Sequence, residues 1–271
     1  MKYLIAALSL LASVSAFARP IVVGVEQASF LPHYSVDEQG RYHGYARDVL
    51  DLFAAVEGVE LTFRPMPAEA LLPALLAGEI DLKYPDNASW ASDAKAGHSL
   101  HYSLPVADYV DGVLVAPRRL GLGVEQLKRL AVVDGWTPRG YEAALSSGQT
   151  LLVPGEDIKQ MIRQALLKDT DGAYYNVVVA TYYLDNIRAR PGALVFDPDL
   201  PHTRSTYHLS TVRHPELVAA FNRFLSENAA SVEQLKTRHG IIVDPAYLGM
   251  EQWKVDFLER QKARQAGEPA P

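Results

Sequence analysis

The sequence contains no cysteine among its 271 residues. Disulfides are therefore excluded, and so is a lipid attached to a cysteine behind a leader peptide. The sequence also lacks G-x-S-x-G, H-E-x-x-H and a phosphate-binding loop, which removes the commonest signs of hydrolases, zinc proteases and nucleotide-binding enzymes. Basic residues are in the minority, with 26 Lys and Arg against 32 Asp and Glu. This balance argues against nucleic acid as a partner and leaves no polybasic patch for a membrane surface.

The long apolar run of this sequence lies at its start. Lys2 precedes the stretch "LIAALSLLASVSAF", and Ala16, Phe17 and Ala18 form a small-x-small pattern, which is typical of a signal-peptide cleavage site. The stretch is shorter than the ~20 residues that a membrane-spanning helix needs. We therefore expect residues 1–18 to be a cleavable signal peptide. The rest is expected to be a soluble periplasmic protein without a lipid anchor.

The first part of the remaining chain alternates between strand and helix patterns. Apolar residues recur with a helical period in two segments, and each segment ends at a glycine. Short β-rich runs flank both helices. This order implies parallel pairing in an open sheet with helices on its faces. Strands are expected at 21–25, 59–66 and 80–84, and helices at 46–56 and 68–77.

A second α/β set follows, and an extended segment lies on each side of it. The two extended segments cover 106–116 and 207–212. Inside the set, the valine-rich stretch "YNVVVAT" at 175–181 predicts a strand. Two amphipathic helices after the second extended segment are expected to return to the first part of the fold.

These patterns predict an α/β protein with two lobes joined by two extended crossovers. We expect a first lobe of residues 19–109 plus 208–255, a second lobe of residues 110–207, and a flexible tail at 256–271. Ligands on open α/β sheets bind beyond the carboxyl ends of the strands. The site is therefore expected between the lobes, and the protein is expected to be a monomer.

The order of motifs resembles the family 3 periplasmic solute-binding proteins. The resemblance is carried by "VVGVEQASFLPHYSVDEQGRYHGYARDVLDLFA", "VELTFRPMPAEALLPALLAGEIDL", "YSLPVADYVDGVLV" and "YHLSTVRHPELVAAFNRFLSEN". It implies the two-lobed type II periplasmic-binding-protein fold, a small-molecule solute, an ABC permease as partner and no cofactor. It covers nearly all of residues 20–240.

Two departures from this family bear on the ligand. The resemblance implies an arginine that clamps the ligand α-carboxylate after the third strand, and Asp93 stands there instead. It also implies an aspartate for the α-amino group, and Thr181 takes that place. An ordinary α-amino acid held in the family's usual way is therefore not expected.

The stretch "EIDLKYPDN" at 79–87 breaks the apolar pattern of the third strand. Lys83 and Tyr84 fall at its carboxyl end, and Asp86 and Asn87 favour a turn. A buried ammonium needs a partner. In one interpretation Lys83 meets an anionic or carbonyl group of the ligand, and Asp86 and Asn87 hydrogen-bond its polar atoms. In the other, Lys83 pairs with Asp86 or Asp81, and the turn is only capped.

Aromatic residues are candidates for a stacking wall beside this polar stretch. Phe30 and Tyr34 lie in the loop after the first strand, Trp90 follows the polar stretch, and Trp136 lies between Gly135 and a proline. The alternative is that these side chains belong to the core, as large aromatics usually do. Thr181 joins the candidates through the resemblance alone.

Three functions remain compatible with the sequence. The first is a binding protein that hands a small polar or anionic solute to an ABC transporter. The second is a periplasmic enzyme like the cyclohexadienyl dehydratases, which would need a carboxylic acid such as Asp86 or Glu142 in the cleft. The third is a loaded protein that docks on a sensor kinase or chemoreceptor. Polar residues on the first crossover, including Asp108, Tyr109 and Asp111, are interpreted as hinge surface.

Overall fold

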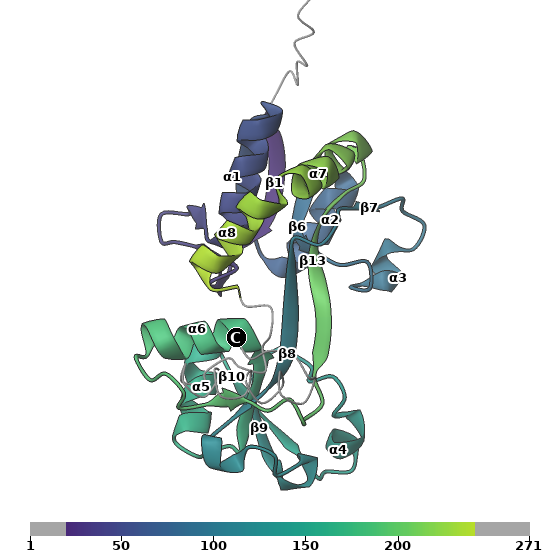
Figure 1. Ribbon diagram of the computed structural model, residues 1–271. Coiled ribbons are helices and arrows are strands. Elements are labelled where there is room, and N and C mark those ends of the chain that lie inside the picture. The colour runs from purple at the N-terminus through teal and green to yellow at the C-terminus, as the bar shows by residue number, and fades with distance from the viewer. Residues whose placement is uncertain (1–19, 242–271) are drawn as a thin grey trace, which may run out of the picture.

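The structure is a computed structural model that describes residues 20–241 (Figure 1). The expected signal peptide and C-terminal tail lie outside these residues. Two strands, β8 (Ala107–Val115) and β13 (Thr203–Thr211), run from one lobe to the other and pair antiparallel. The expected lobe boundaries fall on these two strands. None of the helices in residues 20–241 has the length and apolar character that crossing a bilayer requires.

The first lobe is built on three parallel strands. β1 (Ile21–Glu26) lies between β5 (Leu61–Met66) and β6 (Leu82–Asp86), and β6 pairs with β13 on its other side. A small antiparallel sheet extends from the end of β1. The other elements of this lobe are β2 (Ser29–Phe30), β3 (Tyr34–Val36), β4 (Tyr42–His43), α1 (Tyr45–Glu57), α2 (Ala68–Ala77), α3 (Ser92–Lys95), β7 (His101–Tyr102), α7 (Pro215–Glu227) and α8 (Ala229–His239).

The second lobe repeats this plan with three more parallel strands. β9 (Arg129–Val133) lies between β10 (Leu151–Gly155) and β11 (Gly172–Asn176), and β11 pairs antiparallel with β8. Through β8 and β13 both lobes share one ten-stranded sheet in the described part of the chain. The other elements are β12 (Val195–Phe196), α4 (Glu142–Ser146), α5 (Ile158–Leu166), α6 (Val177–Tyr182), the 3₁₀ helices η1 (Pro117–Arg119) and η2 (Val124–Gln126), and the π-helix η3 (Tyr183–Ile187).

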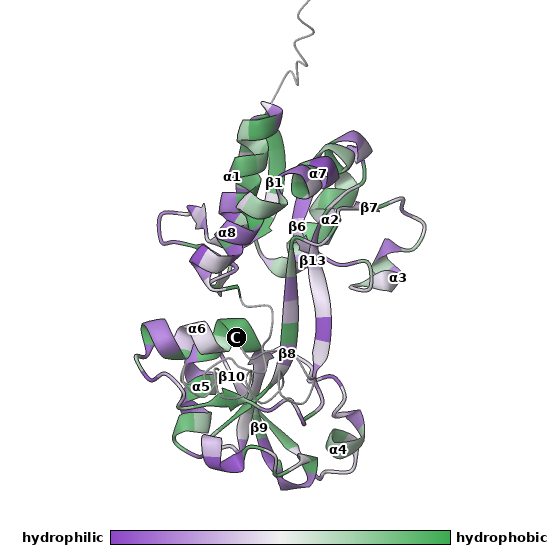
Figure 2. Ribbon diagram, viewed as in Figure 1, coloured by the Kyte–Doolittle hydropathy of each residue, from purple (hydrophilic) through white to green (hydrophobic). Residues whose placement is uncertain are grey.

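The helix α1 illustrates how the pattern of apolar residues produces the fold. Its buried face includes Phe53, whose ring meets Phe221 at 5.0 Å and Phe224 at 5.6 Å, both on α7. It ends at Gly58, whose φ of 66° is the left-handed conformation that glycine adopts without strain. Figure 2 shows the apolar character of β1 and α2 and the polar surface of α8. The C-terminal helices thus close the first lobe, as expected.

Two predicted strands differ from the observed ones. The expected strand at 80–84 is shifted, because β6 includes Pro85 and Asp86 and does not stop at the polar residues. The expected strand at 175–181 is wrong, because β11 ends at Asn176 and the valines form α6. The Asn176 Oδ1 accepts a hydrogen bond from the Val179 N–H at 3.0 Å and caps the helix. Packing of α6 against β8 outweighs the β-propensity of the valines.

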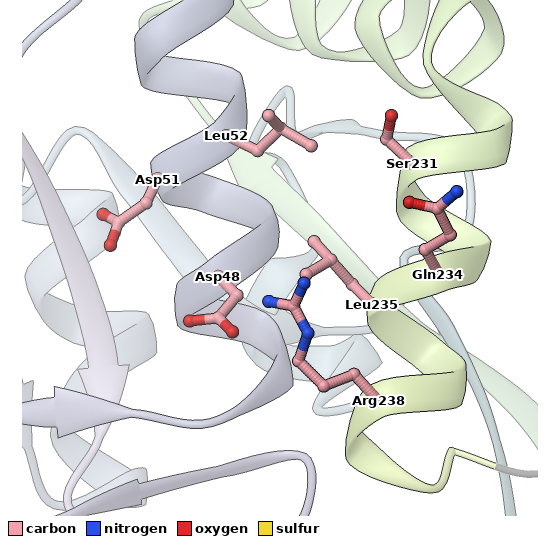
Figure 3. Close-up of a pocket in the computed structure, with 7 residues that line it drawn as sticks. All are labelled: Asp48, Asp51, Leu52, Ser231, Gln234, Leu235 and Arg238. Atoms are coloured by element: carbon pink, nitrogen blue, oxygen red, sulfur yellow. The ribbon is translucent and has the colours of Figure 1, made fainter.

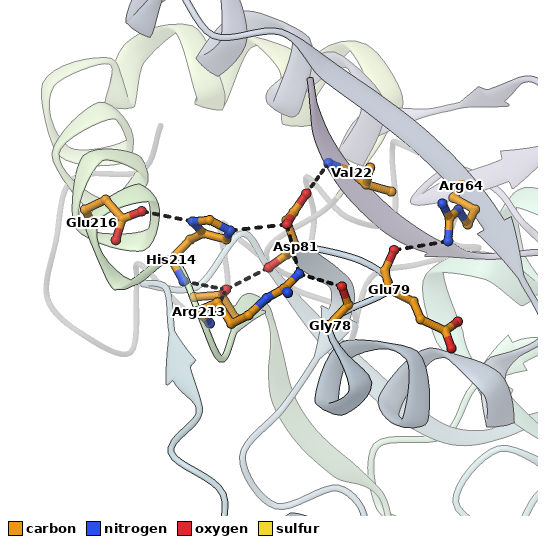
Figure 4. Close-up of polar contacts among 9 residues, drawn as sticks. Val22, Arg64, Gly78, Glu79, Asp81, Arg213, His214 and Glu216 are labelled. Atoms are coloured by element: carbon orange, nitrogen blue, oxygen red, sulfur yellow. Dashed lines mark hydrogen bonds and ion pairs between the residues drawn. The ribbon is translucent and has the colours of Figure 1, made fainter. Parts of the chain in front are cut away.

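A polar network fixes the amino end of β6, away from the lobe junction (Figure 4). Asp81 is 1% exposed and accepts hydrogen bonds from the Val22 N–H at 2.9 Å and from Arg213 at 3.2 Å. The His214 Nε2 lies 3.2 Å from the same carboxylate. Because Asp81 is engaged here, β1, β6 and the start of α7 are held together at this end.

Candidate functional site

The carboxyl ends of the parallel strands in both lobes meet at the lobe junction. In the first lobe β1 ends at Glu26, and in the second lobe β11 ends at Asn176. The rings of Phe30, just after β1, and Tyr175, at the end of β11, lie 5.8 Å apart. The fold therefore brings together the two sheet edges at which ligands of α/β proteins bind.

A series of rings crosses this junction. The Trp136 ring stacks on Tyr175 at 4.3 Å and faces Phe30 at 6.4 Å. Phe30 stacks on Tyr34 at 5.2 Å, and Tyr34 stacks on Tyr42 at 6.1 Å. We call these five residues the interlobe ring stack. Of the residues predicted from sequence, Phe30, Tyr34 and Trp136 are therefore together at the junction.

Several buried polar atoms in and beside the ring stack have no hydrogen-bond partner among residues 20–241. They are both ring nitrogens of His33 and the hydroxyls of Tyr42 and Tyr84. These side chains are 0%, 3% and 1% exposed, respectively. His33 lies 5.9 Å from Phe30, and Tyr84 lies 6.4 Å from Tyr34, between ring centroids. Each such atom costs about 1–3 kcal/mol of stability, so their clustering at one place points to a ligand.

Tyr34 itself is satisfied within the first lobe. Its hydroxyl donates a hydrogen bond to the Glu26 Oε2 at 2.6 Å. Burial, followed by the negative charge of Glu26, raises the pKa of Tyr34 well above its usual range. The phenol therefore stays protonated and holds the carboxylate at the edge of the sheet.

Lys83 belongs to a buried cluster with Asp86, Lys95 and Ser210, which we call the lysine cluster. The Lys83 Nζ lies 3.0 Å from the Asp86 Oδ1 and donates a hydrogen bond to the Pro85 carbonyl at 2.8 Å. The Lys95 Nζ lies 2.8 Å from the same oxygen, and the Ser210 hydroxyl donates to the Asp86 Oδ2 at 2.6 Å. The ammonium of Lys83 thus has the internal partner that the second interpretation required.

Two opposing effects set the protonation of this cluster. Burial raises the pKa of Asp86, but the charge of Lys83 and the hydrogen bonds from Lys95 and Ser210 outweigh it, and the result lies below the usual value. Burial also lowers the pKa of Lys83, although Asp86 opposes that change. The charged state of the buried lysines is therefore favoured by the Asp86 carboxylate, the one acid in the cluster.

Asn87 and Trp90 connect the end of β6 to β13. The Asn87 Nδ2 donates to the Thr206 carbonyl at 2.9 Å, and its Oδ1 accepts from the Ser89 N–H at 2.9 Å. The Trp90 ring lies 5.9 Å from that of Tyr207 and 5.9 Å from the Lys83 Nζ. The amide of Asn87 is therefore already used in capping the turn, while Trp90 lies beside the lysine cluster.

The residue that closes β11 is Asn176, not Thr181. Thr181 lies on α6, where it is 6% exposed and its hydroxyl has no hydrogen-bond partner among residues 20–241. The Asn176 Nδ2 donates to the Tyr207 hydroxyl at 3.2 Å and to the Asp111 Oδ1 at 3.4 Å. An amide thus closes this strand, and Asp111 on β8 lies next to it.

Asp111→Asn is expected to stabilise the protein in alkaline but not in acidic solution. Burial raises the pKa of Asp111 from 3.8 to about 7, although Asn176 and Arg139 oppose the shift. A raised carboxyl pKa means that stability is highest below pH 4 and is lost as the pH rises through about 7. Allowing for partial exposure, the variant should gain about 2 kcal/mol at pH 8 and much less at pH 4.5. Urea unfolding at both pH values measures this, and a gain that is independent of pH contradicts it.

Four residues at this site were missed by the sequence analysis as ligand candidates. His33 carries no sequence signal beyond its place among aromatics in the loop after the first strand. Tyr175 was assigned to the start of a strand, and Tyr207 to the start of a crossover. Lys95 lies in the short helix α3, and nothing in its neighbourhood in the sequence indicates that it reaches Asp86.

A separate groove lies between α1 and α8, away from the lobe junction (Figure 3). Asp48 and Asp51 line one wall, and Gln234 and Arg238 line the other. The Asp48 carboxylate is already 2.8 Å from the His239 Nε2. The Asp51 Oδ2 accepts a hydrogen bond from the Arg47 Nε at 2.7 Å, so both carboxylates of the groove have partners within the chain, unlike the buried polar atoms at the junction.

Comparison with known families and structures is consistent with this architecture. The model of the bacterial extracellular solute-binding proteins, family 3, matches residues 21–239. No curated protein matches the sequence. Among solved structures, the ligand-binding core of GluR0 in complex with L-glutamate is 16% identical with a TM-score of 0.64, over 83% of this chain and 99% of that chain.

Two further solved structures have the same fold. Substrate-binding domain 2 of GlnP from Lactococcus lactis, in an open conformation, is 14% identical with a TM-score of 0.61, over 83% of this chain and 97% of that chain. The ancestral amino acid-binding protein AncCDT-1, described as a precursor of cyclohexadienyl dehydratase, is 19% identical with a TM-score of 0.60, over 81% and 95%. At these identities the likeness extends to the fold and not to the ligand.

Proposed function

Since the chain belongs to family 3 of the bacterial extracellular solute-binding proteins, we propose that it captures a small polar solute between its lobes. The observation that carries this proposal is the cluster of buried polar atoms of His33, Tyr42 and Tyr84, which have no hydrogen-bond partner in residues 20–241. A solute held at the junction would hydrogen-bond to them. Lobe closure would then be favoured by contacts that exist only in the closed form.

The solute is not held as an ordinary α-amino acid in this proposal. Asp93, at the position of the family's arginine, is an exposed carboxylate on α3. The strand that would end in an aspartate ends in Asn176. An anionic solute would depend on the surplus positive charge of Lys83 and Lys95 over Asp86. Because both ammonium groups already contact that carboxylate, we favour a solute recognised through its polar atoms rather than its net charge.

The loaded protein is proposed to act in the periplasm as a monomer that delivers its solute to an inner-membrane ABC permease. Sequence features of the leader and the family assignment support this location. A sensor kinase or chemoreceptor ectodomain is the alternative partner. Either partner would bind the same closed form, so the proposed contacts between the solute and the lobe junction are the same for a permease and for a receptor.

Native mass spectrometry of the protein purified without denaturation tests the proposed function. We expect a mass excess that corresponds to one small molecule and that disappears when the same sample is unfolded. The released molecule should raise the melting temperature of stripped protein without being consumed. A protein that carries no small molecule and that no polar metabolite stabilises contradicts the proposal.

Tyr84→Phe and Tyr45→Phe are expected to change stability in opposite directions. The Tyr84 hydroxyl has no partner in residues 20–241, so its removal should stabilise the unloaded protein by about 1 kcal/mol. The Tyr45 hydroxyl donates to the Val106 carbonyl at 2.8 Å, so its removal should cost about 1 kcal/mol. Solute affinity should fall only in Tyr84→Phe. Thermal unfolding with and without the co-purified solute measures both effects, and equal affinity in the two variants contradicts the role of Tyr84.

An enzyme like the cyclohexadienyl dehydratases is the second candidate function. Neither acid expected from sequence fits it, because Asp86 is locked in the lysine cluster and Glu142 is exposed with a lowered pKa. Asp111 fits better, since its raised pKa keeps part of it protonated near neutral pH. Turnover of prephenate that is lost in Asp111→Asn would support this candidate, and unchanged prephenate excludes it.

A further inference from the structure

One carboxylate lies within the connection between the two lobes. Asp111 is on β8, one of the two strands that run from lobe to lobe (Figure 1). It is paired with Asn176 of β11 on one side and with Thr203 of β13 on the other. In the described part of the chain its carboxylate forms no ion pair, and its one hydrogen bond, from Asn176, is long at 3.4 Å. A partly buried carboxylate with so little compensation is costly to ionise.

The side-chain amide of Asn176 is shared between Asp111 and Tyr207. Its Oδ1 accepts the hydrogen bond from the Val179 N–H that caps α6. Its Nδ2 therefore faces the other way, and it donates to the Asp111 Oδ1 at 3.4 Å and to the Tyr207 hydroxyl at 3.2 Å. A change that draws this amide towards Asp111 weakens its bond to Tyr207. We call Asp111, Asn176 and Tyr207 the hinge triad.

Tyr207 connects the hinge triad to the first lobe. It lies on β13 and is 4% exposed. The ring of His33, in the first lobe, meets it edge-on at 5.3 Å, and the ring of Trp90, also in the first lobe, lies 5.9 Å away. The Asn176 amide, at the end of β11, holds its hydroxyl from the second lobe. The triad therefore links a carboxylate on the crossover to side chains of both lobes.

We propose that the hinge triad is a pH-sensitive latch that holds the lobes closed when Asp111 is protonated and releases them when it is ionised. A neutral carboxyl group leaves the Asn176 amide to Tyr207 and can itself donate a hydrogen bond. An ionised carboxylate attracts the amide more strongly and also requires water. Parting of the lobes removes the cover of His33 and Trp90 from Tyr207 and thereby admits water to the triad. This inference goes beyond the proposed function, because it concerns the lobes themselves and holds for any solute.

The groups that face Asp111 set the pH at which the latch acts. Burial raises the pKa of Asp111 to about 7, although Asn176 and Arg139, in the loop before α4, oppose the shift. Burial lowers the pKa of His33 to about 3, so its ring stays neutral. The Nδ1 of His202, just before β13, lies 2.9 Å from the Leu200 carbonyl. Burial also raises the pKa of the neighbouring phenols, which therefore stay protonated: Tyr174, Tyr175 and Tyr207.

Protonation of Asp111 should favour the closed form by a measurable factor. A carboxyl group whose pKa is higher in the closed form stabilises that form below this pKa, and the contribution is lost as the pH rises through about 7. If opening returns the group to water, its pKa falls towards the ordinary 3.8. The ratio of closed to open protein should then be up to about thirtyfold higher at pH 5.5 than at pH 8.5.

The test measures the distance between the lobes of stripped protein as a function of pH. Ser92→Cys on α3 and Ser146→Cys on α4, one in each lobe, carry a donor and an acceptor dye whose emission is independent of pH. We expect the efficiency of energy transfer to fall between pH 5.5 and pH 8.5, with a midpoint of about 7. Asp111→Asn should keep the high efficiency throughout. Asp108→Asn, at an exposed carboxylate on the same strand, is the control and should behave as the wild type.

The other outcomes overturn the inference. They are an efficiency that does not depend on pH or rises with it in the wild type, a pH dependence that survives in Asp111→Asn, and one that is lost equally in Asp108→Asn. Asp111→Asn is expected to be at least as stable as the wild type, so unfolding does not obscure the result. Because no solute is present, each of these outcomes leaves the proposed function intact, and mass spectrometry tests that function separately.

Discussion

Asp86→Asn is expected to lower the free energy of unfolding by about 3–5 kcal/mol at pH 7. The variant removes the carboxylate that lies 3.0 Å from the Lys83 Nζ and 2.8 Å from the Lys95 Nζ. Both lysines are nearly inaccessible, at 7% and 8% exposure. Two buried ammonium groups would then share only carbonyl partners and an amide. Urea unfolding followed by circular dichroism gives the measurement.

The pH dependence separates this mechanism from a simple packing defect. Burial already lowers the pKa of Lys83, and without Asp86 it should fall further. A lysine with a lowered folded pKa regains stability as the pH rises, so the deficit of Asp86→Asn should shrink between pH 7 and pH 10. Asp93→Asn, at an exposed carboxylate on α3, is the control and should change stability by less than about 0.5 kcal/mol. A loss below about 1 kcal/mol in Asp86→Asn contradicts the lysine cluster as described.

His33→Leu is expected to stabilise the unloaded protein and to weaken solute binding. Leucine has a similar volume but no polar atoms, so the change removes two buried nitrogens that have no partner in residues 20–241. We expect a gain of about 2 kcal/mol at pH 8. Solute affinity should fall at least about tenfold, because the nitrogens that destabilise the unloaded protein are the ones proposed to hydrogen-bond to the solute. Calorimetric titration with the co-purified solute measures the second effect.

The gain in His33→Leu should grow in acid. The folded pKa of His33 is about 3, against 6.5 for the unfolded chain. A lowered histidine pKa means that the wild type keeps its stability above pH 6.5 and loses it as the pH falls towards 3. The variant should therefore gain a further ~2 kcal/mol over the wild type between pH 8 and pH 5. Exposed His43→Leu is the control. An unchanged affinity in His33→Leu would remove this side chain from the site.

The architecture could be predicted because most elements carry local signals. The apolar face of α1 and the glycine after it mark a helix without any tertiary information. The stretch at 175–181 misled the prediction, since valines favour strands and the cap by Asn176 is visible only in context. The valines form the helix α6 because they pack against β8, and the periodicity of the sequence does not show this contact.

Part of the site could be predicted from strand ends alone. The sequence predicts Phe30, Tyr34 and Trp136 as members of an aromatic wall and places Tyr84 at a strand end, and the structure places the four rings beside one another. The two interpretations of Lys83 could not be separated, because its cluster includes Ser210, 124 residues away from Asp86. The sequence does not show that Ser210 contacts Asp86. Contacts of this long-range kind decide whether a buried charge has a partner within the protein or is available to a ligand.

The most direct test of lobe closure is a distance measurement between the two lobes. Because the chain has no cysteine, Ser92→Cys on α3 and Ser146→Cys on α4, both at exposed sites, give two unique positions for spin labels. Distances are recorded by pulsed electron resonance on stripped protein, before and after the small-molecule fraction of a rich bacterial medium is added. We predict a shift to one shorter, narrower distribution. An identical distribution in both samples would contradict capture of a solute between moving lobes.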